Sequence, residues 1–135
     1  MNFTYQEKLV FLLIFIFSGI DFFFRSGNGF DVFLCNHGIG WGIRAPQEWI
    51  FVISPLTLIG VSWYWWKSEH WRIRVACCLI FFGGVMNLMD RIIFGCVRDY
   101  LQLPLFPSFN MADMMLCLGV GLLFFFLFVR PEHQE

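Results

Sequence analysis

The stretch "MMLCLGVGLLFFFLFV", Met114 to Val129, carries no charged residue. A helix needs about 20 predominantly apolar residues to cross a bilayer, and this stretch reaches that length with its flanking residues. Because a segment inside hydrocarbon must satisfy its own backbone hydrogen bonds, the stretch is predicted to be a transmembrane helix. Asp113 stands at its threshold, so this carboxylate either caps the helix or is held at the membrane edge for chemistry.

Three more apolar stretches precede it, and together they predict an all-α membrane protein with four transmembrane helices. The predicted spans cover about 7–25, 48–67, 73–93 and 111–130. The composition agrees, because 59% of the 135 residues are hydrophobic and 14% are charged, against about 25% charged residues in soluble domains. A single domain, 1–135, is expected. The net charge of −1 provides no basic surface for nucleic acid.

Lysine and arginine in short loops predict the orientation, because they favour the cytoplasmic side of a membrane. The side of the termini carries Lys8, Lys67, Arg72, Arg74 and Arg130, and the opposite side carries Arg25, Arg44, Arg91 and Arg98. The short hairpin between the second and third spans is the most densely basic segment. Both termini are therefore expected in the cytoplasm, and the charges of this hairpin are expected to be solvated.

The unusual polar residues gather at the outer ends of the predicted spans. They are Asp21, Asn36, Asn87, Asp90, Arg91, Arg98, Asp99, Asn110 and Asp113. Ionisable groups at membrane depth are costly and usually face the interior of a bundle. Asp99 and Asp113 flank the connection between two antiparallel spans, so their carboxylates are predicted to come close. Close carboxylates share a proton, and such a pair can activate water and protonate a leaving amine, which is aspartyl-protease chemistry.

Simpler interpretations of these residues stay open. Asn110 and Asp113 have the spacing of a helix N-cap and its N3 residue, a variant of the capping box. Asp90 and Arg91 are consistent with a plain ion pair that anchors a helix end. A small proton-coupled carrier would use the same acidic residues as a relay, although a relay needs ionisable groups through the whole membrane.

Motifs in a fixed order resemble those of one family, the lipoprotein signal peptidases, also called signal peptidase II. "NHGIGWG" (36–42) is similar to the family's Asn-x-Gly-x-x-aromatic-Gly/Ser loop, and "NLMDR" (87–91) to its Asn-x-x-Asp-Arg. "GCVRDY" (95–100) is similar to Gly-x-Val-x-Asp-aromatic, and "FNMAD" (109–113) to Phe-Asn-x-Ala-Asp. Asp21 with Arg25 resembles the Asp-Gln-x-x-Lys of the first helix. The chain departs from the family pattern at Phe22, at Arg25, and at Met86, where glycine is usual.

The resemblance implies four transmembrane helices and a small extracytoplasmic β-structured cradle, which would map to Ser26 to Gln47. It implies that Asp99 and Asp113 are the catalytic pair. The residues that it implies in substrate binding or support are Asp21, Asn36, Gly38, Asn87, Asp90, Arg91, Asn110 and Ala112. The substrate would be a prolipoprotein whose cysteine already carries diacylglyceryl, cut just before that cysteine, without a metal or other cofactor.

The resemblance also implies a location in the bacterial cytoplasmic (inner) membrane, with the active site near the extracytoplasmic face. The protein would contact membrane lipids and is expected to be a monomer. A non-catalytic lipoprotein-binding relative is the alternative. The five cysteines have no regular spacing, which predicts neither a zinc site nor a disulfide framework. Whether Cys35 and Cys96 pair stays open.

Overall fold

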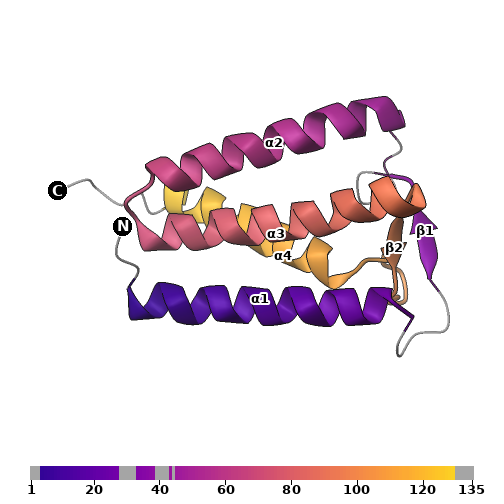
Figure 1. The fold of residues 1–135 in the computed structure, drawn as a ribbon, viewed down its shortest axis with the longest axis horizontal. Helices are drawn as coiled ribbons and strands as arrows, with labels where there is room; N and C mark the ends of the chain where they lie inside the picture. The colour runs from indigo at the N-terminus through magenta and orange to yellow at the C-terminus, as the bar shows by residue number, and fades with distance from the viewer. Residues whose placement is uncertain (1–3, 28–32, 39–42, 44, 130–135) are drawn as a thin grey trace.

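A computed structural model of the chain describes residues 4–27, 33–38, 43 and 45–129. The elements are α1 (Tyr5–Arg25), β1 (Leu34–Asn36), α2 (Gln47–Lys67), α3 (Trp71–Phe94), β2 (Val97–Asp99) and α4 (Met111–Phe124). α4 continues as a π-helical turn, η1 (Phe125–Val129). The helices run side by side, and both strands lie at the end of the bundle opposite the start of α1 (Figure 1).

Three helices of the described chain are long and apolar enough to cross a membrane. They are Gln47–Lys67, Trp71–Phe94 and Met111–Val129. α1 is not among them, because it carries Glu7, Lys8, Asp21 and Arg25 along its length. The fold is therefore mostly helical, with three candidate spans where the sequence predicted four, and with a small two-stranded sheet.

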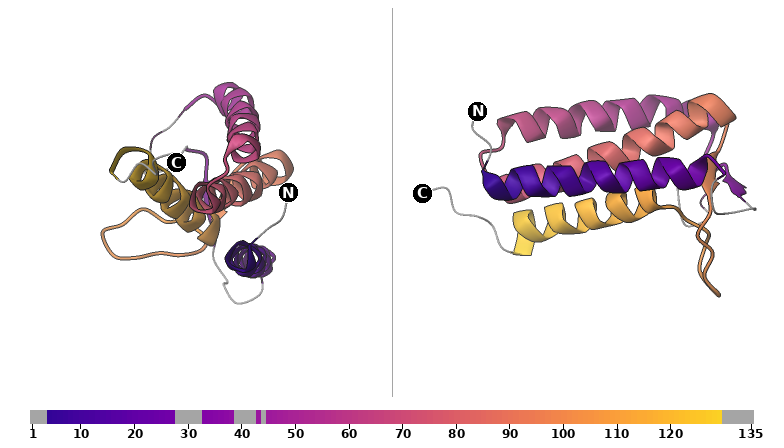
Figure 2. Two further views of the ribbon diagram at one scale, coloured as in Figure 1. Left: turned by 90° about the vertical axis from the view of Figure 1, so that its left-hand side faces the viewer. Right: turned by 60° about the horizontal axis from the view of Figure 1, so that its bottom comes forward.

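α3 is the central helix, and α1, α2 and α4 each pack against it (Figure 2). The closest approach is to α4, where a Cβ added to Gly83 would lie 2.6 Å from the carbonyl oxygen of Ala112. A Cβ at Gly119 would lie 2.9 Å from the carbonyl oxygen of Ala76. These glycines allow the two helices to approach closely, and Met86 packs at the edge of the same apolar core. The carbonyl of Ala112, at the start of α4, is thereby held against Gly83, which lies one helical turn before Asn87 on α3.

The two strands form an antiparallel ladder that pairs Leu34 with Asp99, Cys35 with Arg98, and Asn36 with Val97. Gly95 ends α3 in the left-handed conformation, with φ of 76°, and this conformation turns the chain into β2. Part of the segment predicted as a cradle, 28–32, 39–42 and 44, lies outside the described residues.

Cys35 and Cys96 form a disulfide beside this ladder. The spacing of the cysteines predicted no disulfide framework and left open whether this pair forms, so the bond itself was not predicted. The reason is that residues far apart in the sequence become neighbours only when β1 pairs with β2, and spacing along the chain does not record that pairing.

At the end of the bundle where α1 starts, another prediction differs from the structure. The side chain of Arg74 is buried rather than solvated, with its Nη1 3.0 Å from Oε1 of the buried Glu7. Its guanidinium also lies 5.1 Å from the ring centroid of Trp65. A charge at this depth is costly unless it is paired, and the carboxylate that pairs with it comes from the first turns of α1. The prediction of a solvated hairpin is therefore wrong for Arg74.

Candidate active site

The site is built around the first residue of the α4 capping box. Asn110 is fully buried, and its Oδ1 accepts a hydrogen bond of 2.9 Å from the backbone N–H of Asp113. In return, Oδ2 of Asp113 accepts from the backbone N–H of Asn110 at 3.2 Å. The simpler interpretation of these two residues as a helix cap is confirmed. The same Asn110 amide also donates 2.9 Å to Oδ1 of Asp99, so capping and site building are compatible.

Asp99 is held at the end of β2 with none of its surface exposed. Its Oδ2 accepts 2.9 Å from Nδ2 of Asn36 and, more weakly, 3.5 Å from the hydroxyl of Ser108. Burial raises the pKa of Asp99 to about 6, and the nearby charge of Asp113 acts in the same direction, while the amide donors of Asn36 and Asn110 oppose the shift. Asp99 is therefore a carboxyl group that ionises near neutral pH.

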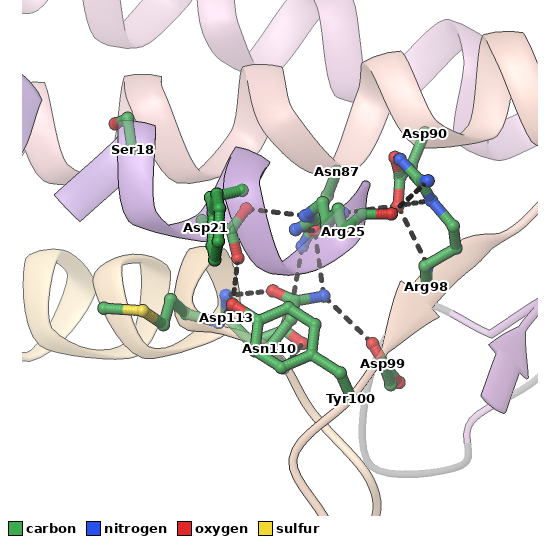
Figure 3. A network of polar contacts seen from close by, with 12 residues as sticks. Ser18, Asp21, Arg25, Asn87, Asp90, Arg98, Asp99, Tyr100, Asn110 and Asp113 are labelled. Atoms are coloured by element: carbon green, nitrogen blue, oxygen red, sulfur yellow. Dashed lines mark hydrogen bonds and ion pairs between the residues drawn. The ribbon is translucent and has the colours of Figure 1, made fainter. Parts of the chain in front are cut away.

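Asp113 is linked to Asp99 through the side chains of Asn87 and Asn110. Its Oδ1 accepts 2.6 Å from Nδ2 of Asn87, whose Oδ1 in turn accepts 3.3 Å from the Asn110 amide. The two carboxylates are thus connected through a chain of two asparagine side chains from α3 and the start of α4 (Figure 3). The network therefore holds together two carboxyl groups, which are of the type that general acid–base chemistry uses.

Arg25 ties this network to α1. Its buried guanidinium contacts Asp21 and Asp90, each at 2.5 Å, and donates 2.8 Å to Oδ1 of Asn87. Asp90 is also paired with Arg98, whose Nη2 lies 2.7 Å from its Oδ1. These partners replace the Asp90–Arg91 ion pair that the sequence suggested, and that interpretation was wrong. Adjacent residues on a helix do not face each other.

Arg91 instead reaches the loop after β1. Its Nη2 donates 2.8 Å to the carbonyl of Gly38, whose own N–H donates 2.8 Å to Oδ1 of Asn36. A side chain at Gly38 would not fit, because an added Cβ would lie 2.6 Å from the carbonyl oxygen of Ile43. Gly38 therefore orients the Asn36 amide, and Arg91 holds Gly38.

Tyr100 joins α1 to the start of α4. Its hydroxyl donates 2.6 Å to Oδ1 of Asp21 and accepts 3.2 Å from the backbone N–H of Met111. Burial, followed by this hydrogen bond to Asp21, raises the pKa of the Tyr100 hydroxyl, so it remains a neutral donor. The buried Asp21 is thus paired on both oxygens, by Arg25 and by Tyr100.

Comparison with known proteins agrees with this geometry. The family model of signal peptidase (SPase) II matches residues 29–129. The chain belongs to the signal peptidase II family.

Similar curated proteins are named lipoprotein signal peptidase. The one from Halalkalibacterium halodurans is 40% identical over 106 residues, which cover 73% of this chain and 67% of that protein. The one from Lactococcus lactis subsp. lactis is 34% identical over 107 residues, 76% of this chain and 71% of that protein. The one from Shewanella pealeana is 31% identical over 141 residues, 99% of this chain and 77% of that protein. The resemblance inferred from the motifs is confirmed.

The fold is also similar to a solved bacterial membrane enzyme, with a TM-score of 0.74. The likeness covers 99% of this chain and 96% of the other at 23% identity. A second bacterial membrane enzyme matches with a TM-score of 0.71 and 24% identity, covering 98% and 97% of the two chains. The family is a family of proteases that act on lipoprotein precursors, and its members named here are bacterial.

The signal peptidase II motifs converge on one place in the structure. The predicted residues that join the polar network are Asp21, Asn36, Gly38, Asn87, Asp90, Arg91, Asp99, Asn110 and Asp113. Ala112 is fully buried and contributes the close contact with Gly83. The predicted site omitted Arg25, Arg98 and Tyr100. Signals for them were present, because Arg25 follows Asp21 by one helical turn, and Arg98 and Tyr100 flank Asp99 inside its motif.

Two pockets meet beside the network. One, of about 480 Å³, runs along α4 and is lined mostly by apolar side chains, with Asp113 among its polar ones. The other, of about 560 Å³, is lined by β1 and the following loop. They share Asn36, Pro107 and Ser108 as lining residues. The two pockets therefore adjoin the same polar residues.

Proposed function

We propose that this member of the family is an aspartyl endopeptidase in which Asp99 and Asp113 are the catalytic pair. The observation that carries the proposal is that the same two asparagine amides, Asn87 and Asn110, connect these carboxylates, which come from different elements. The raised pKa of Asp99, about 6, supports a pair that retains one proton close to neutral pH.

In the proposed reaction, the ionised member of the pair takes a proton from water, and the resulting hydroxide attacks the scissile carbonyl. The protonated member then donates its proton to the leaving amine, and the peptide bond breaks. The pair returns to its singly protonated state once the proton held by the first carboxylate has equilibrated. Because interacting carboxyl groups titrate as a unit, the two roles belong to the pair.

The pockets support a lipid-bearing substrate. Asp113 opens onto the apolar pocket along α4, where a diacylglyceryl chain has apolar surroundings. Asp99 lies behind Asn36 and Ser108, and the Ser108 contact is the longer of the two, at 3.5 Å against 2.9 Å. A substrate carbonyl would displace the Ser108 hydroxyl to reach Asp99. The proposed substrate is a diacylglyceryl-modified prolipoprotein, cleaved just before the lipidated cysteine.

We further propose that all four helices of this single domain cross the membrane, with both termini in the cytoplasm. The charges of α1 are compatible with a span because Asp21 and Arg25 are paired inside the bundle and Glu7 is paired with Arg74. The site then lies near the extracytoplasmic face, where β1 and β2 form part of the cradle. The disulfide beside these strands supports this side, because disulfides persist in oxidising compartments. The protein is proposed to act as a monomer among membrane lipids.

The test is cleavage of a lipidated precursor by the purified protein in detergent. Asp99→Asn and Asp113→Asn are each expected to lower kcat by about 100-fold or more, the usual contribution of general acid–base groups. Glu48→Gln, which removes an exposed carboxylate from the first turn of α2, serves as the matched control and keeps the rate. Wild-type turnover in both aspartate variants would show the mechanism to be wrong. Binding without cleavage by the wild type would identify a non-catalytic relative.

A further inference from the structure

The Cys35–Cys96 disulfide lies next to the proposed catalytic pair. It joins residues 61 apart in sequence, with their Cα atoms 5.5 Å apart. Cys35 directly precedes Asn36, and Cys96 directly precedes Val97, the partner of Asn36 in the ladder. The disulfide therefore lies one residue from Asn36, whose side chain donates a hydrogen bond to Asp99.

Asn36 has a fixed orientation in this position. Its Oδ1 is occupied by the N–H of Gly38 at 2.8 Å, so its Nδ2 points to Asp99 at 2.9 Å, and the amide cannot reverse without losing both hydrogen bonds. The other Asp99 oxygen is held by Asn110, from the start of α4. Asp99 is thus oriented by one amide from the bundle and one from β1.

β1 is a short element for this task. It has three residues, and its ladder with β2 is a two-stranded ribbon, which is marginally stable by itself in water. A slip of one residue in such a ladder turns every side chain to the opposite face. That slip would carry Asn36 away from Asp99. A covalent bond between Cys35 and Cys96 opposes the slip, because it ties β1 to the residue that directly precedes β2.

We propose that the Cys35–Cys96 disulfide fixes the register of β1 on β2 and so positions Asn36 against Asp99, which makes the full rate of cleavage depend on oxidation of this pair. The inference rests on the proposed function, since it takes Asp99 as a member of the catalytic pair. The disulfide is a positioning device, and neither sulfur takes part in the hydrolysis.

The link would form by exchange with a disulfide-containing oxidant outside the cytoplasm. The thiolate of one cysteine attacks the donor disulfide and releases the first donor thiol. The thiolate of the other cysteine then attacks the mixed disulfide and releases the second. Two electrons pass to the donor, whose two sulfurs leave as thiols with the two protons. An excess of a small dithiol, which is itself oxidised to a cyclic disulfide, reverses the reaction.

The experiment compares the oxidised and reduced full-length protein in detergent, with a synthetic diacylglyceryl lipopeptide as substrate. Reduction with dithiothreitol, confirmed by counting free thiols, is expected to lower kcat by about 10- to 100-fold, as small displacements of catalytic groups do. The larger share of the loss falls on kcat rather than KM, and reoxidation restores the rate. Equal kcat in the two states, or a change confined to KM, would overturn the proposal.

Variants separate this disulfide from the other cysteines. Cys35→Ser/Cys96→Ser is expected to have the slow rate of the reduced wild type and no response to reductant. Cys78→Ser removes a free, half-buried cysteine of α3 that lines neither pocket, and it is expected to keep both the wild-type rate and its sensitivity to reductant. A reductant-insensitive Cys78→Ser variant, or a reductant-sensitive double variant, would contradict the assignment.

Hydrogen exchange tests the positioning without reference to activity. On reduction, the amides of Leu34–Asn36 and Val97–Asp99 are expected to exchange faster while those of α3 remain protected. Unchanged exchange in both strands would overturn the proposal whatever the rates. Faster exchange combined with absence of cleavage in both states would support the positioning role and overturn the proposed peptidase function, so the two failures are distinguishable.

Discussion

Asp99→Asn is expected to change the pH dependence of stability as well as the activity. Burial raises the pKa of Asp99 to about 6 from an ordinary value of 3.8. The folded protein therefore binds this proton more tightly than the unfolded chain does. The stability that the neutral carboxyl group contributes is fully present below about pH 4 and is lost as the pH rises through about 6.

The size of the effect follows from the shift. One pKa unit corresponds to 1.36 kcal/mol, so the change from 3.8 to about 6 amounts to about 3 kcal/mol between pH 4 and pH 8. The side chain that replaces Asp99 in the Asp99→Asn variant does not titrate, so the variant does not lose this stability as the pH rises. The free energy of unfolding of Asp99→Asn minus that of the wild type is therefore expected to rise by about 3 kcal/mol over this range.

The Asp99→Asn variant is also expected to lose some stability by the same amount at every pH. Both Asp99 oxygens accept hydrogen bonds from the amide nitrogens of Asn36 and Asn110. Neither amide can reverse cheaply, because their own oxygens are occupied by the backbone N–H groups of Gly38 and Asp113. An asparagine amide nitrogen at position 99 would face a donor, which costs about 1–3 kcal/mol at every pH. The variant is thus expected to be less stable than the wild type at pH 4 and similar or more stable at pH 8.

Thermal unfolding in detergent, followed by the fluorescence of the six tryptophans, measures this difference. A change of about 3 kcal/mol corresponds to a shift of the unfolding midpoint on the order of 10 °C for a chain of this size. Glu48→Gln, at an exposed carboxylate, is the control and is expected to give a curve parallel to the wild type. If the curve of Asp99→Asn is also parallel, within about 1 kcal/mol, Asp99 does not carry the raised pKa and the reasoning fails.

Gly83→Ala is expected to lower the free energy of unfolding by about 1–3 kcal/mol, because the new Cβ would lie 2.6 Å from a carbonyl oxygen of α4. Gly60→Ala in α2 is the control, because the new methyl group has open space around it. It is expected to raise the free energy of unfolding by about 0.5–1 kcal/mol. Equal effects of the two changes in thermal unfolding would contradict the close α3–α4 contact. Arg74→Met is expected to cost about 3–5 kcal/mol, because it leaves the buried Glu7 carboxylate unpaired. The double variant Glu7→Gln/Arg74→Met should recover most of that loss, and a double variant as unstable as the single one would refute the pairing.

The helices and the family were predictable because their signals are local. A run such as Met114 to Val129 has few alternatives to a helix inside hydrocarbon, and the motif order carries the relation to other proteins. The grouping of the polar residues at one end followed from placing each on its helix. In the structure the motif residues form one network, in which Asn110 both caps α4 and donates to Asp99.

Individual partners were less predictable, because they depend on how the helices rotate against each other. Asp90 pairs with Arg25, which is 65 residues away, and not with the adjacent arginine. Arg74 pairs with Glu7 across α1 and α3, although its hairpin has the sequence of a solvated loop. Hydropathy and residue spacing indicate how deep in the membrane a residue lies and which face of its own helix it occupies. They contain no information on which face of another helix lies opposite.

The capping box of α4 has a consequence for the biogenesis of the protein. α4 follows α1, α2 and α3 in the chain, and the Asn110 side chain that caps α4 also donates a hydrogen bond to Asp99. Fraying of one turn at this end removes a donor from each proposed catalytic carboxylate at once. A chain in which α4 is not yet in place therefore has no assembled pair of the proposed catalytic carboxylates.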